Sequence, residues 1–264
     1  MLVLISILIF ILGLSFGSFL SVVINRLETN EKGIIFGRSH CVFCKKVLKN
    51  RDLVPLLSIL ILKGKCRFCH KKISYDYFFI ELMTGLLAVL TFLKFPFLMD
   101  GVFYGWQLLS FILYFIFGLF FIGIFFSDLK NMEIPDMLLF PFMGVSLIGS
   151  LFIAKTGLVS IIIATVIALI FFGGQIVLSK GKWLGEGDLY LGLAMAFIFG
   201  WQQFLIAICL TYAIGAILSL GLIASKKVTP KTQVPFAPFM VMGSVLTIFL
   251  GERILNWYLQ LLNF

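Results

Sequence analysis

The stretch QLLSFILYFIFGLFFIGIFFS, residues 107–127, decides the fold of this chain, and Asp128 follows it directly. The stretch has no charged residue and matches the roughly 20 apolar residues that a helix needs to cross a bilayer. In lipid, such a segment satisfies its backbone polar groups by forming a helix. A carboxylate at the edge of the hydrocarbon layer is costly, so Asp128 indicates a functional position.

The composition is that of a polytopic membrane protein. Of the 264 residues, 61% are hydrophobic and 12% are charged, and the mean hydropathy is +1.11. Soluble domains are about half apolar and about a quarter charged, so a soluble domain with a single anchor is excluded. No small-residue cleavage site follows the apolar run at residues 1–24, which we therefore expect to remain as a transmembrane helix.

We expect an all-α polytopic membrane protein with about eight transmembrane helices. The candidate spans are residues 2–24, 77–93, 107–127, 137–154, 158–178, 189–199, 204–224 and 236–250. The sixth span is short. If it is a tilted or re-entrant segment, the count falls to seven.

The distribution of Lys and Arg predicts the orientation. With eight spans, the loops at 25–76, 128–136, 179–188 and 225–235 share one side of the membrane. These loops hold all of the 21 Lys and Arg residues except Lys94, Lys155 and Arg253, which places them in the cytoplasm. The net charge of +9 thus reflects membrane orientation, and we expect no nucleic-acid partner. Asp128 and Asp188, which played no part in this assignment, both fall at the cytoplasmic surface.

The loop after the first span carries two Cys-x-x-Cys pairs about twenty residues apart, the spacing of a small zinc-ribbon-like domain. The four predicted zinc ligands are Cys41, Cys44, Cys66 and Cys69. A loop of about fifty residues has little core, so zinc would have a structural role. Disulfides or a redox-active, metal-free site are the alternatives, although cytoplasmic thiols are normally reduced. The fifth cysteine, Cys209, is expected to be buried in a helix.

Asp128 and Asp188 are the candidate catalytic residues. Two carboxylates around a shared water can hydrolyse a peptide bond when one is ionised and the other protonated. Glycines in Gly185-Glu186-Gly187-Asp188 would let a substrate backbone approach closely. Either acid could instead be a helix cap or an interface residue, and the chain a scaffold or a transporter of ions or solutes with a zinc-stabilised loop. The rival acids are Glu81, Glu133, Asp136 and Glu186.

Over almost its whole length the chain resembles the type IV prepilin peptidases, bacterial membrane aspartyl proteases of the Gly-x-Gly-Asp kind. Asp128, seven residues before Pro135, resembles the first aspartate motif of this family. The other similar segments are GSFLSVVINRL (17–27), SHCVFC (39–44), LVPLLS (53–58), GKCRFC (64–69), ELMTG (81–85), GEGD (185–188) and VPFAPF (234–239). Lys130 and Tyr190 depart from the pattern, because many members have Asp and Lys there.

The resemblance implies that Asp128 and Asp188 cut the short basic leader from type IV prepilins or pseudopilins, after a glycine, at the cytoplasmic face of the bacterial inner membrane. It also implies methylation of the new N-terminus with S-adenosylmethionine, an activity in which the cysteine loop is implicated. The chain would then consist of a first transmembrane helix (1–24), a cytoplasmic cysteine domain (25–76) and a transmembrane aspartyl peptidase domain (77–264), with prepilins and membrane lipid as its partners.

Overall fold

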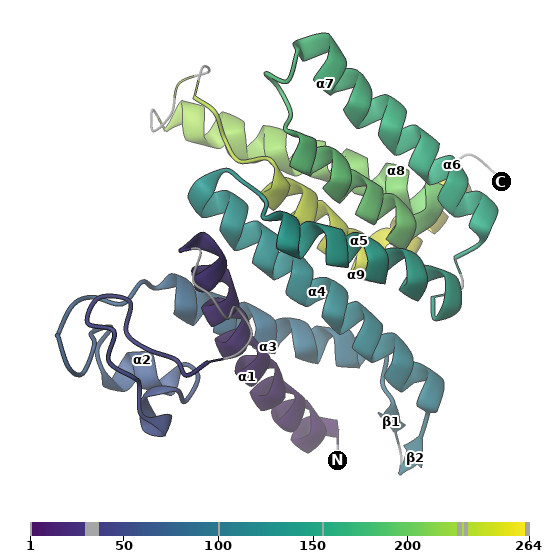
Figure 1. Cartoon of the computed structure of the whole chain (residues 1–264). Helices are drawn as coiled ribbons and strands as arrows, with labels where there is room; N and C mark the ends of the chain where they lie inside the picture. Colours follow the sequence, from purple (N-terminus) through teal and green to yellow (C-terminus); the bar gives the residue numbers. More distant parts are fainter. Residues whose placement is uncertain are drawn as a thin grey trace. The chain divides into compact units, whose positions relative to one another are not determined.

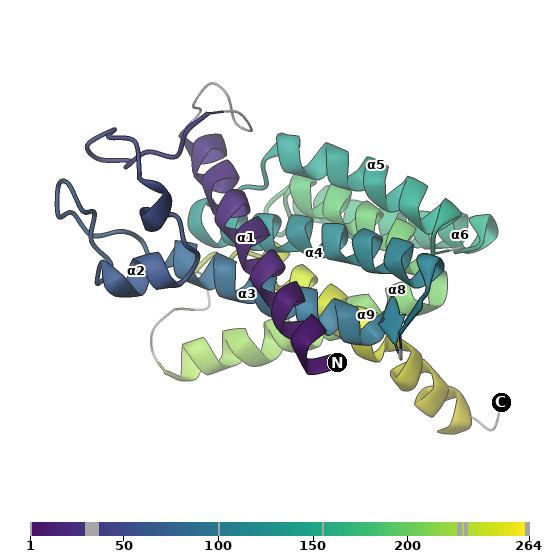
Figure 2. The same cartoon turned by 90° about the horizontal axis from the view of Figure 1, so that it is seen from below.

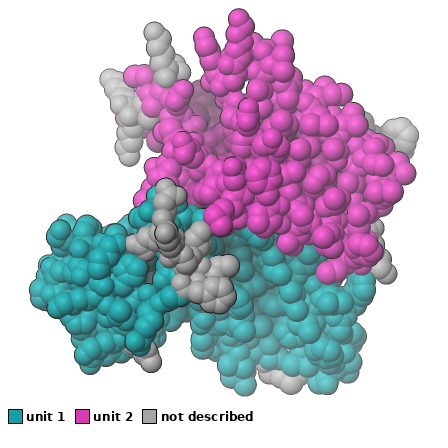
Figure 3. All heavy atoms as spheres, viewed as in Figure 1, with its two compact units in different colours: residues 1–126 teal, residues 127–264 magenta. Residues whose placement is uncertain are grey.

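The computed structural model describes residues 2–29, 37–99, 101–154, 156–225, 229 and 232–261. Five basic residues used to predict the orientation, Lys32, Lys155, Lys226, Lys227 and Lys231, lie outside these ranges. The chain divides into two compact units, Met1–Phe126 and Ser127–Phe264 (Figure 3). Each unit is described by itself below.

The predicted all-helical membrane fold is confirmed. Among the described residues, six helices are long and apolar enough to cross a membrane. They are α1 (Leu2–Glu28), α3 (Asp76–Lys94), α4 (Gly105–Asn131), the helical stretch Leu158–Ser179, α8 (Glu186–Ala224) and α9 (Ala237–Leu261). A seventh apolar helix, α5 (Asp136–Phe152), is shorter.

In the first unit α1 packs against α3, and both views show the two helices crossing (Figures 1 and 2). Small residues permit this close approach, as is common between membrane helices. A Cβ atom at Gly13 would lie 2.7 Å from the Cβ of Ala88, and one at Gly17 would lie 2.7 Å from the Cα of Glu81. The spacing Gly-x-x-x-Gly on α1 therefore sets where Glu81 lies against the helix.

The cysteine loop lies between α1 and α3 and contains a 3-10 helix, η1 (Asn50–Asp52), and the short helix α2 (Leu57–Ile61). The strands β1 (Leu98–Met99) and β2 (Val102–Phe103) form an antiparallel hairpin before α4, with Leu98 paired to Phe103. The sequence analysis did not predict this hairpin, because two-residue strands are too short to show an alternating pattern.

In the second unit α8 packs against α9, α6 (Leu158–Ala168) and α5. A π-helical turn, η2 (Leu169–Gly173), joins α6 to α7 (Gly174–Ser179). The sixth and seventh predicted spans both lie in α8, which is kinked at Gly200, where φ is 62° and ψ is 177°. Because φ is positive there, glycine is favoured. The backbone N–H of Trp201, just after the kink, donates to Ser160 Oγ at 3.1 Å.

Candidate functional site

The four predicted cysteine ligands converge in the first unit. Their Sγ atoms all lie within 4.8 Å of one another, and the Sγ atoms of Cys41 and Cys69 are 3.8 Å apart. Tetrahedral zinc with Zn–S bonds of about 2.3 Å places its sulfur atoms about 3.8 Å apart, so the cluster fits the ion. All four thiols are free rather than paired in disulfides. His40 and His70 are not members of the cluster.

Two similar turns present the thiols. In the first turn, Cys41 N–H donates to Lys46 O and Lys45 N–H donates to Cys41 O; in the second, Cys66 N–H donates to Lys71 O and His70 N–H donates to Cys66 O. Lys45 and His70 occupy matching left-handed positions, with φ of 55° and 56°. This local repeat explains why the short Cys-x-x-Cys pattern was sufficient to predict the cluster.

The two turns also contact each other through their side chains. Lys46 Nζ lies 5.3 Å from the centroid of the Phe68 ring, and Lys71 Nζ lies 4.8 Å from the centroid of the Phe43 ring. Each turn thus provides one ammonium and one aromatic face, an arrangement that gives attractive cation–π contacts. These contacts link the two turns that carry the thiol pairs.

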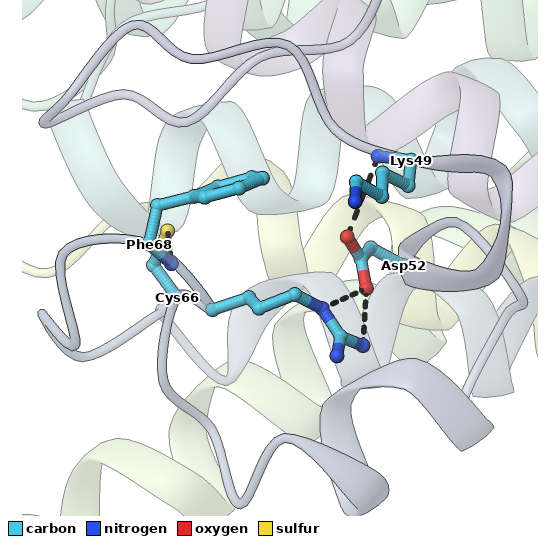
Figure 4. A network of polar contacts seen from close by, with 5 residues as sticks. Lys49, Asp52, Cys66 and Phe68 are labelled. Atoms are coloured by element: carbon cyan, nitrogen blue, oxygen red, sulfur yellow. Dashed lines mark hydrogen bonds and ion pairs between the residues drawn. The ribbon is translucent and has the colours of Figure 1, made fainter.

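An ion pair supports the second turn. The Arg67 guanidinium donates to Asp52 Oδ1 from Nε at 2.8 Å and contacts the same oxygen from Nη2 at 2.6 Å, and Lys49 N–H donates to Asp52 Oδ2 at 3.4 Å (Figure 4). The hydrogen bond from Arg67 lowers the pKa of Asp52 below its ordinary value and outweighs burial, which acts in the opposite direction. Because the Asp52 side chain is 1% exposed, water screens this pair weakly.

Metal binding must remove protons from the thiols. The Lys71 backbone N–H lowers the pKa of Cys69, but desolvation and hydrogen bonds with the other three thiols outweigh it and raise that pKa to about 11. A divalent cation reverses this balance, because it binds the thiolate form and releases protons.

Asp128 lies in the last turn of α4 and is the second residue of the second unit. Asp128 is only 6% exposed. Its Oδ2 accepts a hydrogen bond of 3.0 Å from the backbone N–H of Ala237, the first residue of α9. Asp128 therefore satisfies one of the unpaired N–H groups at the start of a helix distant in sequence.

Asp188 lies in the first turn of α8, within the same unit. Its Oδ2 accepts from the backbone N–H of Gly185 at 3.1 Å, so it caps its own helix. The charge of Asp128 reaches the Asp188 carboxyl group, although it acts on it less than burial and the Gly185 hydrogen bond do, so the two carboxyl groups lie in one neighbourhood. Gly187 packs on Ile134: a Cβ atom added at Gly187 would lie 3.4 Å from the Cβ of Ile134.

Three of the rival acids, Glu133, Asp136 and Glu186, are exposed, whereas Asp128 is buried and Asp188 is partly buried. Glu81 belongs to the first unit and is 4% exposed. Asp136 is the first residue of α5, and the cap position before it is Pro135. The prediction that Cys209 is buried is wrong: it is exposed on α8, because apolar residues of a membrane helix also face lipid.

The sequence analysis missed a polar pair near Asp188. Tyr212 on α8 donates from its hydroxyl to Gln175 Oε1 on α7 at 2.9 Å, and the charge of Asp188 acts on Tyr212. Gln175 follows the π-helical turn η2, a feature often found at functional sites. A polar Gln in an otherwise apolar segment was the signal that could have revealed the pair.

Comparison with known proteins gives two family matches that together cover most of the chain. The Bacterial Peptidase A24 N-terminal domain matches residues 11–95, and the Type IV leader peptidase family matches residues 115–220. No solved structure matches significantly.

Similar proteins span almost the full chain. A prepilin leader peptidase/N-methyltransferase of Bacillus subtilis is 30% identical over 261 residues, which cover 96% of this chain and 97% of the relative. One from Aeromonas salmonicida is 28% identical over 282 residues, covering 96% and 93%. This likeness favours a peptidase over the alternative function, a transporter of ions or solutes. The chain therefore belongs to the bacterial type IV prepilin leader peptidase/N-methyltransferase family, whose members are multi-pass membrane enzymes.

Proposed function

We propose that this protein cleaves the short basic leader from type IV prepilins or pseudopilins, after a glycine, with Asp128 and Asp188 activating a water molecule at the cytoplasmic face of the membrane. One observation carries the proposal. Two aspartates, each at the end of an apolar helix, lie in the same unit with interacting charges, and the family membership makes prepilins the expected substrate class.

The hydrogen bonds support this use of the pair. In both aspartates it is Oδ2 that accepts a backbone N–H, from Ala237 for Asp128 and from Gly185 for Asp188. Each bond orients its carboxyl group at a helix N-terminus, where the peptide dipoles stabilise negative charge. The second oxygen of each group can then contact a shared water.

The chemistry needs one proton between the two groups. Like charges at close range do not both ionise, so the pair acts as one acid and one base. The ionised carboxylate takes a proton from water, whose oxygen attacks the scissile carbonyl carbon. The protonated carboxyl donates to the carbonyl oxygen.

The position of the site fits a prepilin, which presents a basic leader followed by an apolar helix. A site at the membrane boundary can accept the helix laterally while the leader stays in the cytoplasm. Glu133, exposed in the loop after α4, and Glu186, exposed as the first residue of α8, would attract the leader. Reversal of the charge at Glu186 should therefore weaken leader binding, and an unchanged affinity would remove this role.

We further propose that the cysteine cluster binds one structural zinc ion. Four thiolates fill a tetrahedral site and leave no position for a substrate. The names of the similar proteins also support N-methylation of the newly exposed N-terminus. In that step the amine lone pair would form a C–N bond, the C–S bond of S-adenosylmethionine would break with its electrons on sulfur, and the amine would lose a proton. The division into residues 1–24, 25–76 and 77–264 stays a prediction.

Incubation of the purified protein with a prepilin precursor tests the peptidase proposal. We expect wild type to release the leader, and Asp128→Ala and Asp188→Ala to release none. Asp136→Asn is the matched control, because Asp136 is an exposed acid in the same region. Full cleavage by either alanine variant would contradict the assignment of the pair.

A further inference from the structure

The short helix α2 in the cysteine loop turns an apolar face away from the protein. Ser58 and Ile59, which are 7% and 8% exposed, form its inner face. Its outer face consists of Leu57, Leu60 and Ile61, which are 55%, 61% and 72% exposed. Apolar side chains that gather on one exposed face indicate a contact with lipid or with a protein partner. We therefore expect the outer face of α2 to be covered.

Two hydrogen bonds attach α2 to the beginning of the membrane helix α3. Before α2, the backbone N–H of Leu56 donates to Glu81 Oε2 at 2.7 Å. After α2, the N–H of Ile73 donates to Gly64 O at 2.8 Å. The hydroxyl oxygen of Tyr75, the residue before α3, lies 3.7 Å from the position of a Cβ added at Gly64. Both views accordingly show α2 beside the beginning of α3 (Figures 1 and 2).

These attachments place α2 at the depth of the membrane boundary. The span α3 begins at Asp76. Glu81, which receives the first hydrogen bond, lies about 7.5 Å along the helix axis from that residue. A helix that lies in the membrane interface buries its apolar face about 5–10 Å into the boundary between headgroups and acyl chains. The depth at which α2 is attached therefore matches that of an interfacial helix.

Basic residues adjoin the outer face of α2. Residues 53–75 contain Lys and Arg but neither Asp nor Glu. Lys63 and Lys65 follow α2 and are exposed, and Lys72, also exposed, pairs with Lys65 in an isolated β-bridge. Anionic headgroups attract clusters of Lys beside a membrane helix. A second copy of this chain, with its net charge of +9, and the basic leader of a prepilin would both be repelled, so the charge favours an anionic lipid surface.

We propose that α2 is an interfacial anchor. Its outer face inserts into the bilayer beside α3, and the three lysines Lys63, Lys65 and Lys72 contact anionic headgroups of the same leaflet. The cysteine loop is thereby docked on the membrane surface, in addition to being joined to α1 and α3 by the chain. The anchor requires neither leader cleavage nor methyl transfer, so its test is independent of both.

Quenching of tryptophan fluorescence by brominated lipid tests the anchor in the full-length protein reconstituted into nanodiscs. Ile61→Trp places an indole on the outer face of α2. Val47→Trp is the matched control, because Val47 is 45% exposed but belongs to the first cysteine turn. Subtraction of the wild-type signal removes the four native tryptophans. Each protein is measured in acyl-brominated phosphatidylcholine, alone and mixed with brominated phosphatidylglycerol, which is anionic.

We expect anionic brominated bilayers to quench the added fluorescence of Ile61→Trp and not that of Val47→Trp. Quenching should be about twofold weaker or less in neutral bilayers, because the attraction between lysines and headgroups is missing there. Replacement of the three lysines by Gln in the Ile61→Trp protein should remove this difference. Absence of quenching in both bilayers would overturn the anchor, and equal quenching in both would overturn the role of the lysines.

Folding is checked by the melting temperature of each variant. If Ile61→Trp fails to fold, Leu60→Trp, at a position that is 61% exposed, takes its place. A dimer that the change of Leu57, Leu60 and Ile61 to Ser converts into a monomer would assign the outer face to a second copy and overturn the proposal. Protection of the indole from bromine by added prepilin precursor would likewise assign the face to the substrate.

The measurement also separates the anchor from the proposed peptidase function. Asp128→Asn, in the other unit, should leave the quenching of Ile61→Trp unchanged. A protein that cleaves prepilin but shows no quenching would refute the anchor and leave the peptidase intact. A protein whose indole is quenched but that cleaves no prepilin would refute the peptidase and leave the anchor intact.

Discussion

Asp128 Oδ2, at the end of α4, accepts a hydrogen bond of 3.0 Å from the backbone N–H of Ala237 at the start of α9, 109 residues away in sequence. The proposed catalytic carboxylate is thereby also a structural cap. Substitutions at Asp128 must therefore be designed to separate the loss of chemistry from the loss of this bond.

Asp128→Asn should separate the two roles. Asparagine keeps an oxygen that can accept from Ala237 N–H, but it cannot act as an acid or a base. We expect leader cleavage to fall by roughly 10²–10⁴-fold or more, with a melting temperature close to that of wild type. Asp128→Ala should in addition lose about 1–3 kcal/mol of stability, because a buried donor is left unsatisfied. Equal melting temperatures for the Asn and Ala variants would argue against the capping role.

Tyr212 and Gln175 should be coupled energetically. Their hydrogen bond of 2.9 Å joins α8 to α7, and hydrogen bonds between membrane helices contribute about 0.6 kcal/mol on average. A double-mutant cycle with Tyr212→Phe and Gln175→Leu, followed by unfolding measurements, should give a coupling free energy of that order. Strictly additive single effects would show that the two side chains act independently.

Removal of zinc should destabilise the cysteine loop. We expect about one zinc per chain in wild type and almost none in Cys41→Ser, because three thiolates cannot complete the tetrahedral set. The exposed Cys209→Ser is the matched control and should retain the metal. Because the thiols must lose protons, the affinity measured by competition with a chelator should rise with pH. An affinity independent of pH would speak against thiolate ligands.

The ion pair between Asp52 and Arg67 should contribute stability only above acidic pH. The pKa of Asp52 in the folded protein lies below the ordinary value of 3.8. Asp52 therefore binds fewer protons when folded, and its contribution is complete above about pH 5 and disappears as the pH falls through the folded pKa. The difference in melting temperature between wild type and Asp52→Asn should thus be largest near neutral pH and shrink towards pH 3. Both proteins lose zinc in acid, so this difference isolates the ion pair.

Gly17→Ala should be far more harmful than the same change elsewhere in an apolar helix. The added Cβ would lie 2.7 Å from the Cα of Glu81, so α1 and α3 must separate. Overpacking of this kind costs about 1–3 kcal/mol. Gly144→Ala in α5, where no atom lies within 4 Å of an added Cβ, should be tolerated. Equal unfolding free energies for the two variants would contradict the packing role of Gly17.

The sequence by itself determined the helical membrane fold, the four-cysteine cluster and the two candidate aspartates. These features depend on local patterns: uninterrupted apolar runs, the Cys-x-x-Cys spacing, and acids placed at the ends of spans. Each pattern lies within a short segment of sequence. The spans in particular can be recognised one at a time, because a helix in lipid satisfies its own backbone hydrogen bonds. The short β-hairpin and the exposure of Cys209 were not predictable in this way.

Only the tertiary structure decided which distant groups meet. Three hydrogen bonds join segments far apart in sequence: Ala237 N–H to Asp128, Tyr212 to Gln175, and Leu56 N–H to Glu81. Lipid is as apolar as the helices themselves, so hydrophobicity places a helix in the membrane without choosing its neighbour. The neighbour is chosen by close packing at small residues such as Gly17 and by a few polar contacts, and neither is visible until the helices are assembled.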